Sequence, residues 1–311
     1  GQMADGMVRD QADWFERATP FLFLLLWSGG YVAGRLGIVD STPITLVAIR
    51  FVLAAGLFVL IAWLMGARWP RPAAMGWIAL VGLLNQGLYF TFAYLAFDEG
   101  IGAGTAALIS ALQPVITACV ALPLLGERVR VHQWLGLVLG FAGVTLVIWN
   151  KLELGLGTAA GVAWAAASVL SITVGTLVQK RFCPVFDLWT GGAVQYLAAA
   201  AFTIAAVLVS ETPSVNPTFS FVLVMAYLVI GNSVIAVSLM NLMIRKGEAA
   251  RVTSLLYLVP GGAAALAWLI LGETFSPLAL AGLAVAAFGV WLVMGQRGRR
   301  APARRGQATK S

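Results

Sequence analysis

The sequence predicts an all-α membrane protein with ten transmembrane helices, arranged as two inverted-topology repeats of five helices around a central cavity. Sixty per cent of the 311 residues are hydrophobic and only 11 % are charged, whereas soluble chains carry roughly 25 % charged residues. Apolar runs of about the 20 residues that a spanning helix needs follow one another along the chain. The tripeptide Leu-Gly-Glu occurs at 125–127 and again at 271–273, each time with a proline 12 residues before the glycine.

Turn and cap residues divide the apolar runs into ten predicted helices. Short segments rich in proline and polar residues, such as Asp40 to Pro43 and Arg68 to Pro72, end one helix and begin the next. In chain order, the predicted helices are 18–37, 43–66, 73–97, 102–125, 131–150, 156–180, 187–210, 219–244, 249–271 and 277–295.

Cationic residues sort the connecting segments onto two sides of the membrane. The N-terminal segment, the loops after the even-numbered helices and the C-terminal tail carry 16 lysines and arginines, whereas the other loops carry only Arg35 and Lys151. The positive-inside rule then places both termini in the cytoplasm, which requires an even number of spans. We therefore expect a multi-pass membrane protein with both termini in the cytoplasm.

A constant offset of 146 residues relates Pro114 to Pro260 and the first Gly-Glu pair to the second. Each half holds five spans, an odd number, so the halves must insert in opposite orientations about a pseudo-two-fold axis in the membrane plane. The same offset pairs Gly136 with Gly282 and Gly143 with Gly289. The predicted divisions are a cytoplasmic segment at 1–17, repeats at 18–150 and 151–295, and a basic cytoplasmic tail at 296–311.

Each repeated proline lies near the middle of the bilayer, measured from opposite faces. Twelve residues at about 1.5 Å each put it roughly 18 Å from the helix end. A proline frees the carbonyl four residues earlier, and interrupted backbone at this depth is tolerated where it packs on protein or lines a wet cavity. A packing kink is the alternative for either proline alone. Two related breaks favour a cavity, with Pro114, Pro260 and Gly261 as the helix-break or gating positions.

Polar and aromatic side chains collect at the same depth, three or four residues apart on shared helix faces. Serines and threonines in spanning helices most often bond to their own helix or to a neighbour, so amides and aromatic residues are the stronger candidates. Trp164 is matched to Trp27 by its place in the first helix of its half, and Asn85 to Asn232 by an offset of 147. The predicted substrate-binding residues are Asn85, Tyr89, Ser110, Gln113, Trp164, Ser168, Asn232 and Tyr257.

Charged side chains are scarce within the predicted spans. Aspartates and glutamates lie near helix ends, and Arg50 is the cation well inside a span, where it could snorkel outward or pair with a carbonyl. Proton-coupled carriers usually hold a buried carboxylate or histidine relay, and the sequence presents none, so facilitated diffusion, exchange and proton coupling stay open. The Gly-Glu turns are interpreted as helix caps, with gating as the alternative. The glycines at 136, 140 and 143 are interpreted as a stripe for close helix packing.

The composition predicts no metal, cofactor or nucleic-acid site. Cys119 and Cys183 fall in or beside apolar runs and are interpreted as packing residues, and His132 is a single histidine in a loop. The basic residues that give the net charge of +7 lie in short loops and the tail, where they indicate membrane orientation. The expected partners are a small-molecule substrate and the lipid bilayer, and the oligomeric state stays open, with a monomer compatible.

Several segments together carry a family pattern: Leu26 to Ala33 with Arg35, Ile49-Arg50-Phe51, and the two stretches from proline to Gly-Glu. In these the chain resembles, over residues 18–295, the EamA-like branch of the drug/metabolite transporter superfamily, whose members pair two five-helix domains. The resemblance implies export of small metabolites or drugs across the bacterial inner membrane by alternating access. The uncharged aromatic character of the predicted cavity is similar to that of the amino-acid exporters of this superfamily, especially those for aromatic amino acids. The second half departs from the pattern after Trp164, so function is not carried across there.

The leading hypothesis is an exporter of amino acids or similar small amphipathic metabolites. A multidrug or cationic-compound exporter is the second, and it would need a carboxylate in the cavity. An intramembrane lipid-modifying enzyme would need clustered histidine, aspartate or cysteine near a membrane face, which this sequence lacks. A scaffold or receptor without solute flux is the remaining alternative.

Overall fold

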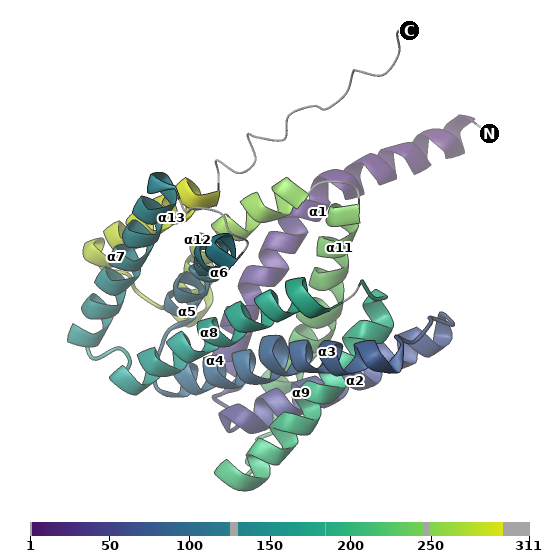
Figure 1. Ribbon diagram of the computed structural model, residues 1–311, viewed down its shortest axis with the longest axis horizontal. Helices are drawn as coiled ribbons and strands as arrows, with labels where there is room; N and C mark the ends of the chain where they lie inside the picture. The colour runs from purple at the N-terminus through teal and green to yellow at the C-terminus, as the bar shows by residue number, and fades with distance from the viewer. Residues whose placement is uncertain (1, 125–129, 184, 246–248, 295–311) are drawn as a thin grey trace, which may run out of the picture.

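The computed structural model describes residues 2–124, 130–183, 185–245 and 249–294, and helices joined by short turns make up this part of the chain (Figure 1). One isolated antiparallel β-bridge, between Ser41 and Val215, occurs in the described residues. The helices are α1 (Gln2–Gly37), α2 (Pro43–Leu64), α3 (Pro72–Gly82), η1 (Leu83–Leu88), α4 (Tyr89–Asp98), α5 (Ala103–Ser110), α6 (Gln113–Leu124), α7 (Val131–Glu153), α8 (Ala159–Phe182), α9 (Leu188–Ser210), α10 (Phe219–Ala226), η2 (Tyr227–Ala236), α11 (Val237–Arg245), α12 (Ala249–Leu271) and α13 (Pro277–Met294).

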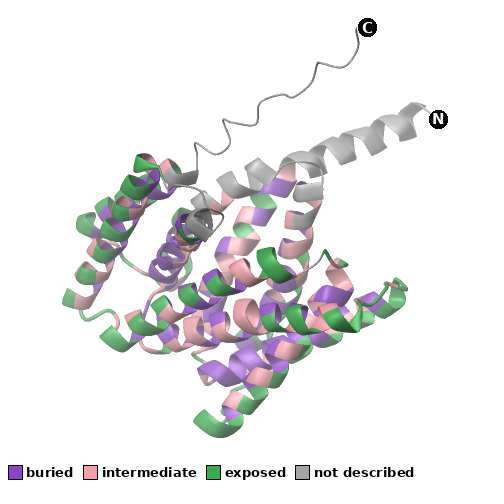
Figure 2. Ribbon diagram, viewed as in Figure 1, coloured by how far each residue is buried: buried purple, intermediate pink, exposed green. Residues whose placement is uncertain are grey.

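The helical membrane class predicted from composition is confirmed. Among the described residues, six helical stretches are long and apolar enough to cross a membrane: Pro43–Leu64, Pro72–Asp98, Val131–Glu153, Ala159–Phe182, Leu188–Ser210 and Phe219–Met240. Shorter apolar helices cover Ala103–Thr117, Leu258–Leu271 and Pro277–Leu292. Many residues are exposed along the outer sides of the helices (Figure 2). Large apolar side chains are frequent among them, as expected where the surrounding medium is lipid. The count of ten spans stays a prediction.

From residue 43 onward, the helices begin and end within three residues of the predicted bounds. Proline stands at the first position of α2, α3 and α13, where its missing amide is one that the helix leaves unbonded anyway. Threonine or aspartate caps begin α8, α9 and α10. For example, the Thr158 hydroxyl accepts from Gly161 N, and the Asp187 carboxylate accepts from Thr190 N. The exception is α1, which is helical from Gln2, through most of the segment at 1–17 that the sequence sets apart as polar.

Two of the long helices contain a wider, π-helical stretch that periodicity alone does not predict. The helix from Pro72 to Asp98 widens at η1, and the helix that begins at Phe219 widens at η2. Asn85 lies in the first and Asn232 in the second, at the offset by which the sequence pairs them. Such stretches leave backbone carbonyls without the usual partner and occur often at functional sites. One carbonyl in η1, that of Leu84, accepts a 2.8 Å hydrogen bond from the Ser171 hydroxyl of α8.

The two repeated prolines have different consequences for their helices. α5 ends at Ser110, a two-residue turn follows, and α6 begins at Gln113 with Pro114 as its second residue. By contrast, α12 continues through Pro260 and Gly261. The second interruption that the sequence predicts is therefore not present as a break, since a single missing amide can be accommodated inside a packed membrane helix.

Glycines allow a close contact between α7 and α13. α7 and α13 lie side by side and antiparallel (Figure 1), with Gly143 against Gly282 and Gly289 against Gly136. A Cβ atom added at Gly289 would lie 2.5 Å from Gly136 O and 2.5 Å from Gly140 N. No side chain fits between these backbones. The packing stripe interpreted from the sequence thus lies at a helix–helix contact.

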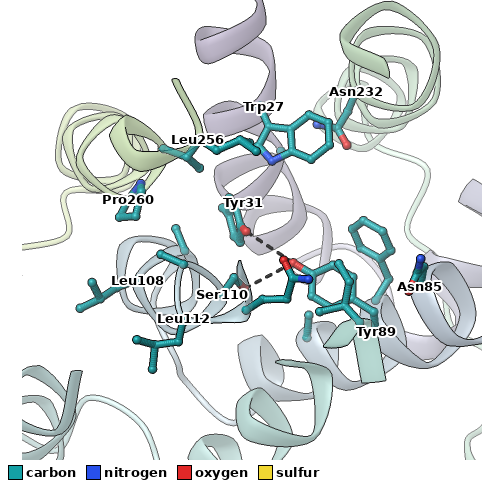
Figure 3. Close-up of a pocket in the computed structure, with 18 of the residues that line it drawn as sticks. Trp27, Tyr31, Asn85, Tyr89, Leu108, Ser110, Leu112, Asn232, Leu256 and Pro260 are labelled. Atoms are coloured by element: carbon teal, nitrogen blue, oxygen red, sulfur yellow. Dashed lines mark hydrogen bonds between the residues drawn. The ribbon is translucent and has the colours of Figure 1, made fainter. Parts of the chain in front are cut away.

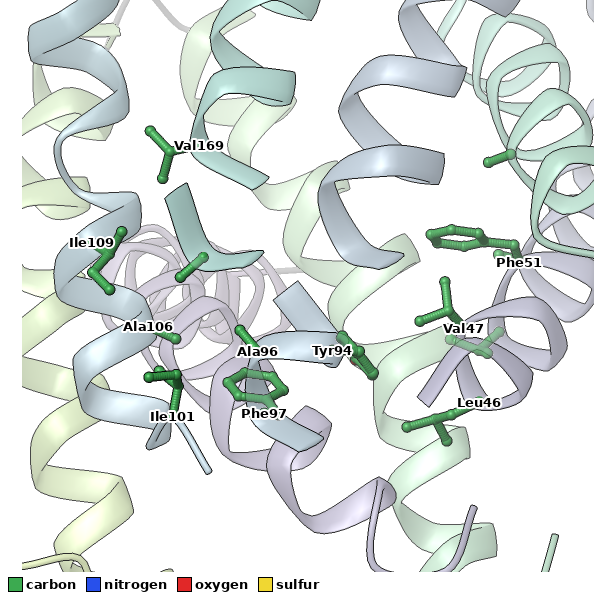
Figure 4. Close-up of a cluster of buried hydrophobic side chains, with 14 of the residues drawn as sticks. Leu46, Val47, Phe51, Tyr94, Ala96, Phe97, Ile101, Ala106, Ile109 and Val169 are labelled. Carbon is green, nitrogen blue, oxygen red and sulfur yellow. The ribbon is translucent and has the colours of Figure 1, made fainter. Parts of the chain in front are cut away.

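The largest buried cluster joins the two halves of the chain. Aromatic rings from α2, α4 and α9 meet in it, with Phe51 5.7 Å and Phe58 5.2 Å from Tyr196 between ring centroids. Apolar residues of α5 and α8 continue it, among them Ile109 and Val169 (Figure 4). The core therefore forms a wall that both halves share.

Carboxylates at helix ends make further links between the halves. The Glu211 carboxylate accepts from the backbone amides of Ile44 and Thr45 at the start of α2, at 3.3 and 2.5 Å. The Glu273 carboxylate accepts from Ala103 N at the start of α5, at 2.8 Å. A negative group is favoured at a helix N-terminus because amides and dipole both point there. Glu273 is a cap, as interpreted, but for a helix of the other half; Glu127 lies outside the described residues.

Candidate functional site

A cavity of about 330 Å³ opens near the middle of the bundle (Figure 3). Its walls come from both halves of the chain: α1, α2, α4, α5 and α6 with the π-helical stretch η1, and α8, α9, α11, α12 and α13 with η2. The carbon-rich lining has polar groups at few points, an arrangement typical of small-molecule sites.

Three hydroxyl groups form a chain along one wall. The Tyr31 hydroxyl of α1 lies 3.4 Å from the Tyr89 hydroxyl of α4, which lies 3.3 Å from Ser110 Oγ at the end of α5 (Figure 3). Tyr89 ends in this position because the wide turn of η1 comes directly before it, and Ser110 because α5 stops there. The chain joins three helices around a polar point in an aromatic wall.

Gln113 opens α6 directly after the turn that follows α5. Its Nε2 donates to Thr117 Oγ1 at 3.1 Å and to Thr176 Oγ1 of α8 at 3.2 Å. The interruption before Pro114 therefore places an amide side chain at the cavity and holds it through one helix of each half.

Arg50 of α2 lies in the cavity wall with 2 % of its surface exposed. Its Nη1 donates to the Tyr94 hydroxyl at 3.2 Å, and its Nη2 donates to Asn232 Oδ1 at 2.9 Å and to Ser233 Oγ at 3.3 Å. The guanidinium carbon lies 4.3 Å from the centroid of the Phe90 ring. Arg50 is thus held inside the bundle rather than snorkelling outward, and one of its partners is a side-chain carbonyl.

The two asparagines of the π-helical stretches each face a glycine on the first helix of the opposite half. A Cβ atom at Gly30 of α1 would lie 2.6 Å from Asn232 Nδ2, and one at Gly175 of α8 would lie 2.8 Å from Asn85 Cγ. Asn232 Nδ2 also donates to Leu26 O at 3.2 Å. In both halves, a side chain at the glycine would displace the asparagine that faces it.

Six of the residues predicted for the site lie in the cavity lining, and three do not. Trp164 is 36 % exposed and stacks on Phe92 at 5.5 Å, and the Ser168 hydroxyl donates to Ala165 O of its own helix at 2.7 Å. Gly261 is exposed and outside the lining, and the side chains of Pro114 and Tyr257 lie outside the described residues. The six in the lining are Asn85, Tyr89, Ser110, Gln113, Asn232 and Pro260.

The placement of Trp164 has a physical explanation. Its match to Trp27 counts residues from the predicted start of each helix, where bounds are least certain. The glycines Gly30 and Gly175, which make the corresponding contacts, differ by 145 residues. At that offset Trp27 corresponds to Ile172, and both line the cavity.

Sequence reasoning did not place Trp27, Tyr31 and Arg50 in the cavity. Trp27 and Tyr31 are four residues apart, so they share a face of α1. Arg50 had a signal, since an ionisable residue inside a membrane span is a functional-site hypothesis by default. Among the described residues that line the cavity, Arg50 alone carries a positive charge.

The chemistry of the lining suits the binding of a small solute. Aromatic faces, hydroxyls, amides and one guanidinium can hold a small amphipathic solute. Within the described ranges, no group of three or more His, Cys, Asp or Glu side chains is placed to hold a metal ion.

Comparisons with known proteins point to one family. The model of the EamA-like transporter family matches residues 19–149 and residues 159–295. The chain is 27 % identical over 277 residues to the "Uncharacterized inner membrane transporter YedA" of Escherichia coli (strain K12), covering 88 % of each chain. It is 29 % identical over 294 residues to the "Probable terminal-alkyne amino-acid exporter" of Streptantibioticus cattleyicolor, covering 93 % of this chain and 95 % of that one. A crystal structure that is 23 % identical shares the fold, with a TM-score of 0.62 over 91 % of this chain and 98 % of that one.

Proposed function

This chain belongs to the EamA-like transporter family, and from that premise we propose that it is a secondary transporter exporting small metabolites of the amino-acid class across the bacterial inner membrane by alternating access. One relative is named as an inner membrane transporter and another as a probable amino-acid exporter. Family membership also argues against the lipid-modifying enzyme.

The observation that carries the proposal is the cavity shared by the two halves. Its volume of about 330 Å³ is at the small end of ligand sites, which suits a single metabolite rather than a bulky drug. Aromatic rings and hydroxyls from α1 and α4 face it together with groups from η2 and α12. A site between two halves can be opened to either side of a membrane by rocking one against the other.

The proposal includes ten spans in two inverted repeats, and the glycine contacts of α7 and α13 support it. Gly143 meets Gly282, and Gly289 meets Gly136. Adding the repeat offset of 146 to Gly143 gives Gly289, and subtracting it from Gly282 gives Gly136. The offset therefore converts the first contact into the second. A two-fold axis between two antiparallel helices produces such a pair. The family model's match to each half separately also supports the duplication.

We also propose that both termini lie in the cytoplasm. The loops after α2 and α8 are on one face of the bundle, where the Thr190 hydroxyl donates to Arg68 O at 3.1 Å and Trp77 stacks on Phe182 at 4.6 Å. These loops and the adjoining helix ends carry Arg68, Arg71, Lys180 and Arg181. The positive-inside rule supports a cytoplasmic position for this face.

The competing transport hypothesis, a carrier for organic cations, has the wrong electrostatics. Among the described lining residues, the charged group is the guanidinium of Arg50, and its positive charge would repel a cationic solute. An uncharged or carboxylate-bearing solute meets no such repulsion.

Counterflow in proteoliposomes tests the proposal. Purified protein is reconstituted with an excess of unlabelled amino acid inside, and uptake of the labelled amino acid is followed, with and without an imposed proton gradient. Tyr89→Ala removes an aromatic ring from the cavity lining and should lower amino-acid uptake. Trp164→Ala changes a residue outside the lining and should leave the uptake unchanged. If the parent protein shows no uptake above empty liposomes for any amino acid, the proposed export is wrong.

A further inference from the structure

We propose that Arg50 is the receptor for an anionic group of the transported solute, and that the cavity takes solutes carrying a carboxylate, with or without an ammonium group. The inference rests on the proposed function for one point only, that the central cavity is the substrate site. It names the chemistry that the site selects and the residue that selects it.

The first step is the charge balance around Arg50. Its side chain is 2 % exposed, and an arginine stays protonated in proteins. The groups that accept its hydrogen bonds are the Tyr94 hydroxyl, the Asn232 amide oxygen and the Ser233 hydroxyl, all neutral. Its Nε has no hydrogen-bond partner among the described residues. The guanidinium is therefore solvated by dipoles, and its charge is not balanced by a carboxylate contact in the described part of the chain.

The second step is energetic. A charge buried away from water is strongly destabilising unless it is paired, and buried charges in proteins are almost always paired. The Phe90 ring at 4.3 Å recovers part of this through a cation–π contact. A carboxylate that entered the cavity would supply the missing charge, and arginine–carboxylate hydrogen bonds are roughly twice as strong as neutral ones.

The third step is access. Arg50 and Asn232 both belong to the cavity lining, so the bond between Nη2 and Asn232 Oδ1 is at the wall. A carboxylate can compete with the amide oxygen for Nη2, because a charged acceptor is the stronger one. Asn232 would still be held by its 3.2 Å bond to Leu26 O. The aromatic rings of Trp27, Tyr31 and Phe90, which also line the cavity, would then face the apolar part of the solute.

A purely structural role is the competing explanation, since Arg50 ties α2 to α4 and η2. That role predicts loss of stability when Arg50 is replaced, but no preference for carboxylates in the parent protein. Ligands that differ only in whether they carry a carboxylate therefore distinguish the structural role from the binding role. This comparison uses the parent protein and does not depend on whether an Arg50 variant folds.

The experiment measures binding to the purified parent protein by isothermal titration with three aromatic probes of similar shape: 3-phenylpropionate, its uncharged amide 3-phenylpropionamide, and 2-phenylethylamine. We expect the carboxylate to bind about tenfold or more tightly than the amide, from the gain of a charge-assisted bond, and the amine to bind weakest. In Arg50→Gln, and in Arg50→Lys as a second variant, the ratio of carboxylate to amide affinity should fall toward one, with a smaller fall for lysine. Arg68→Gln, an exposed loop arginine, is the matched control and should keep the parent's ratio.

The outcomes separate this inference from the export proposal. Equal binding of carboxylate and amide by the parent overturns the role of Arg50, even if amino acids are transported. A carboxylate preference that survives in Arg50→Gln also overturns it. Carboxylate binding that depends on Arg50, without counterflow of any amino acid, supports the inference and contradicts export.

Discussion

Replacing Gly289 with alanine should separate α7 from α13. An alanine Cβ at this position would lie 2.5 Å from Gly136 O and from Gly140 N, whereas ordinary contact begins at 3.4 Å. Both obstacles are backbone atoms, so no side-chain rotation relieves them. The helices must move apart by roughly 1 Å, and a gap of that size forfeits about half of the dispersion attraction of the atoms that line it.

The expected loss is at the upper end of the range for overpacking, about 2–3 kcal/mol in the free energy of unfolding. Unfolding of the purified protein by SDS in mixed micelles, followed by tryptophan fluorescence, measures it. Gly56→Ala is the matched control, because no atom lies within 4 Å of a Cβ there and alanine is the better helix former. A Gly289→Ala protein as stable as the control would refute the packing argument.

The same experiment examines the repeat. Gly143→Ala meets the backbone of Gly282 and Ala286 as Gly289→Ala meets that of Gly136 and Gly140, so the two losses should be alike. The double variant should lose less than the sum of the two, since one widening of the helix pair relieves both overlaps. Strongly unequal losses would count against a two-fold axis between α7 and α13.

Three further predictions concern the cap, the cavity and the cytoplasmic face. Glu273→Ala removes the acceptor for Ala103 N and should destabilise the protein by about 1 kcal/mol in the same unfolding assay, whereas the same change at an exposed glutamate should not. Trp27→Ala should raise KM in counterflow about tenfold by removing an aromatic face of the cavity, and an unchanged KM would remove that residue from the site. Burial raises the pKa of the Cys183 thiol, so less thiolate is present at neutral pH; maleimide labelling should be slow at pH 7 and rise about tenfold per pH unit below that pKa. Labelling from the cytoplasmic side alone is expected, and equal labelling from outside would contradict the proposed orientation.

The helices were predictable because a lipid-spanning chain must satisfy its backbone internally, and proline and capping residues then mark the ends. This is why α2 begins at Pro43 and α13 at Pro277, where the sequence predicts. α1 was not bounded in this way, because its polar first part continues the same helix.

The residues of the cavity lining were predictable where depth and residue type coincide. Asn85, Tyr89, Ser110 and Gln113 were placed at mid-membrane by counting from helix ends, and all four line the cavity. Arg50 was not assigned there, because its role depends on contacts with α4 and η2 that no local spacing reveals.

The wide turns could not be read from spacing either. A π-helical stretch changes which of the following residues share a helix face. The residue spacing around η1 and η2 does not predict this change. Trp164 is the opposite case, where residue type suggested a site that the helix face does not support.

The presence of η1 and η2 at matching places also bears on the ancestry of the chain. A π-helical stretch of this kind is what results when one residue is inserted into an existing α-helix. Two independent insertions at the same point of two helices would require a coincidence. A single insertion that was then copied with its helix would not require one. Under the proposed duplication, the wide turns around Asn85 and Asn232 are thus best explained as older than the copying of the five-helix unit. The five-helix unit that the proposed duplication copied then already carried the widened helix.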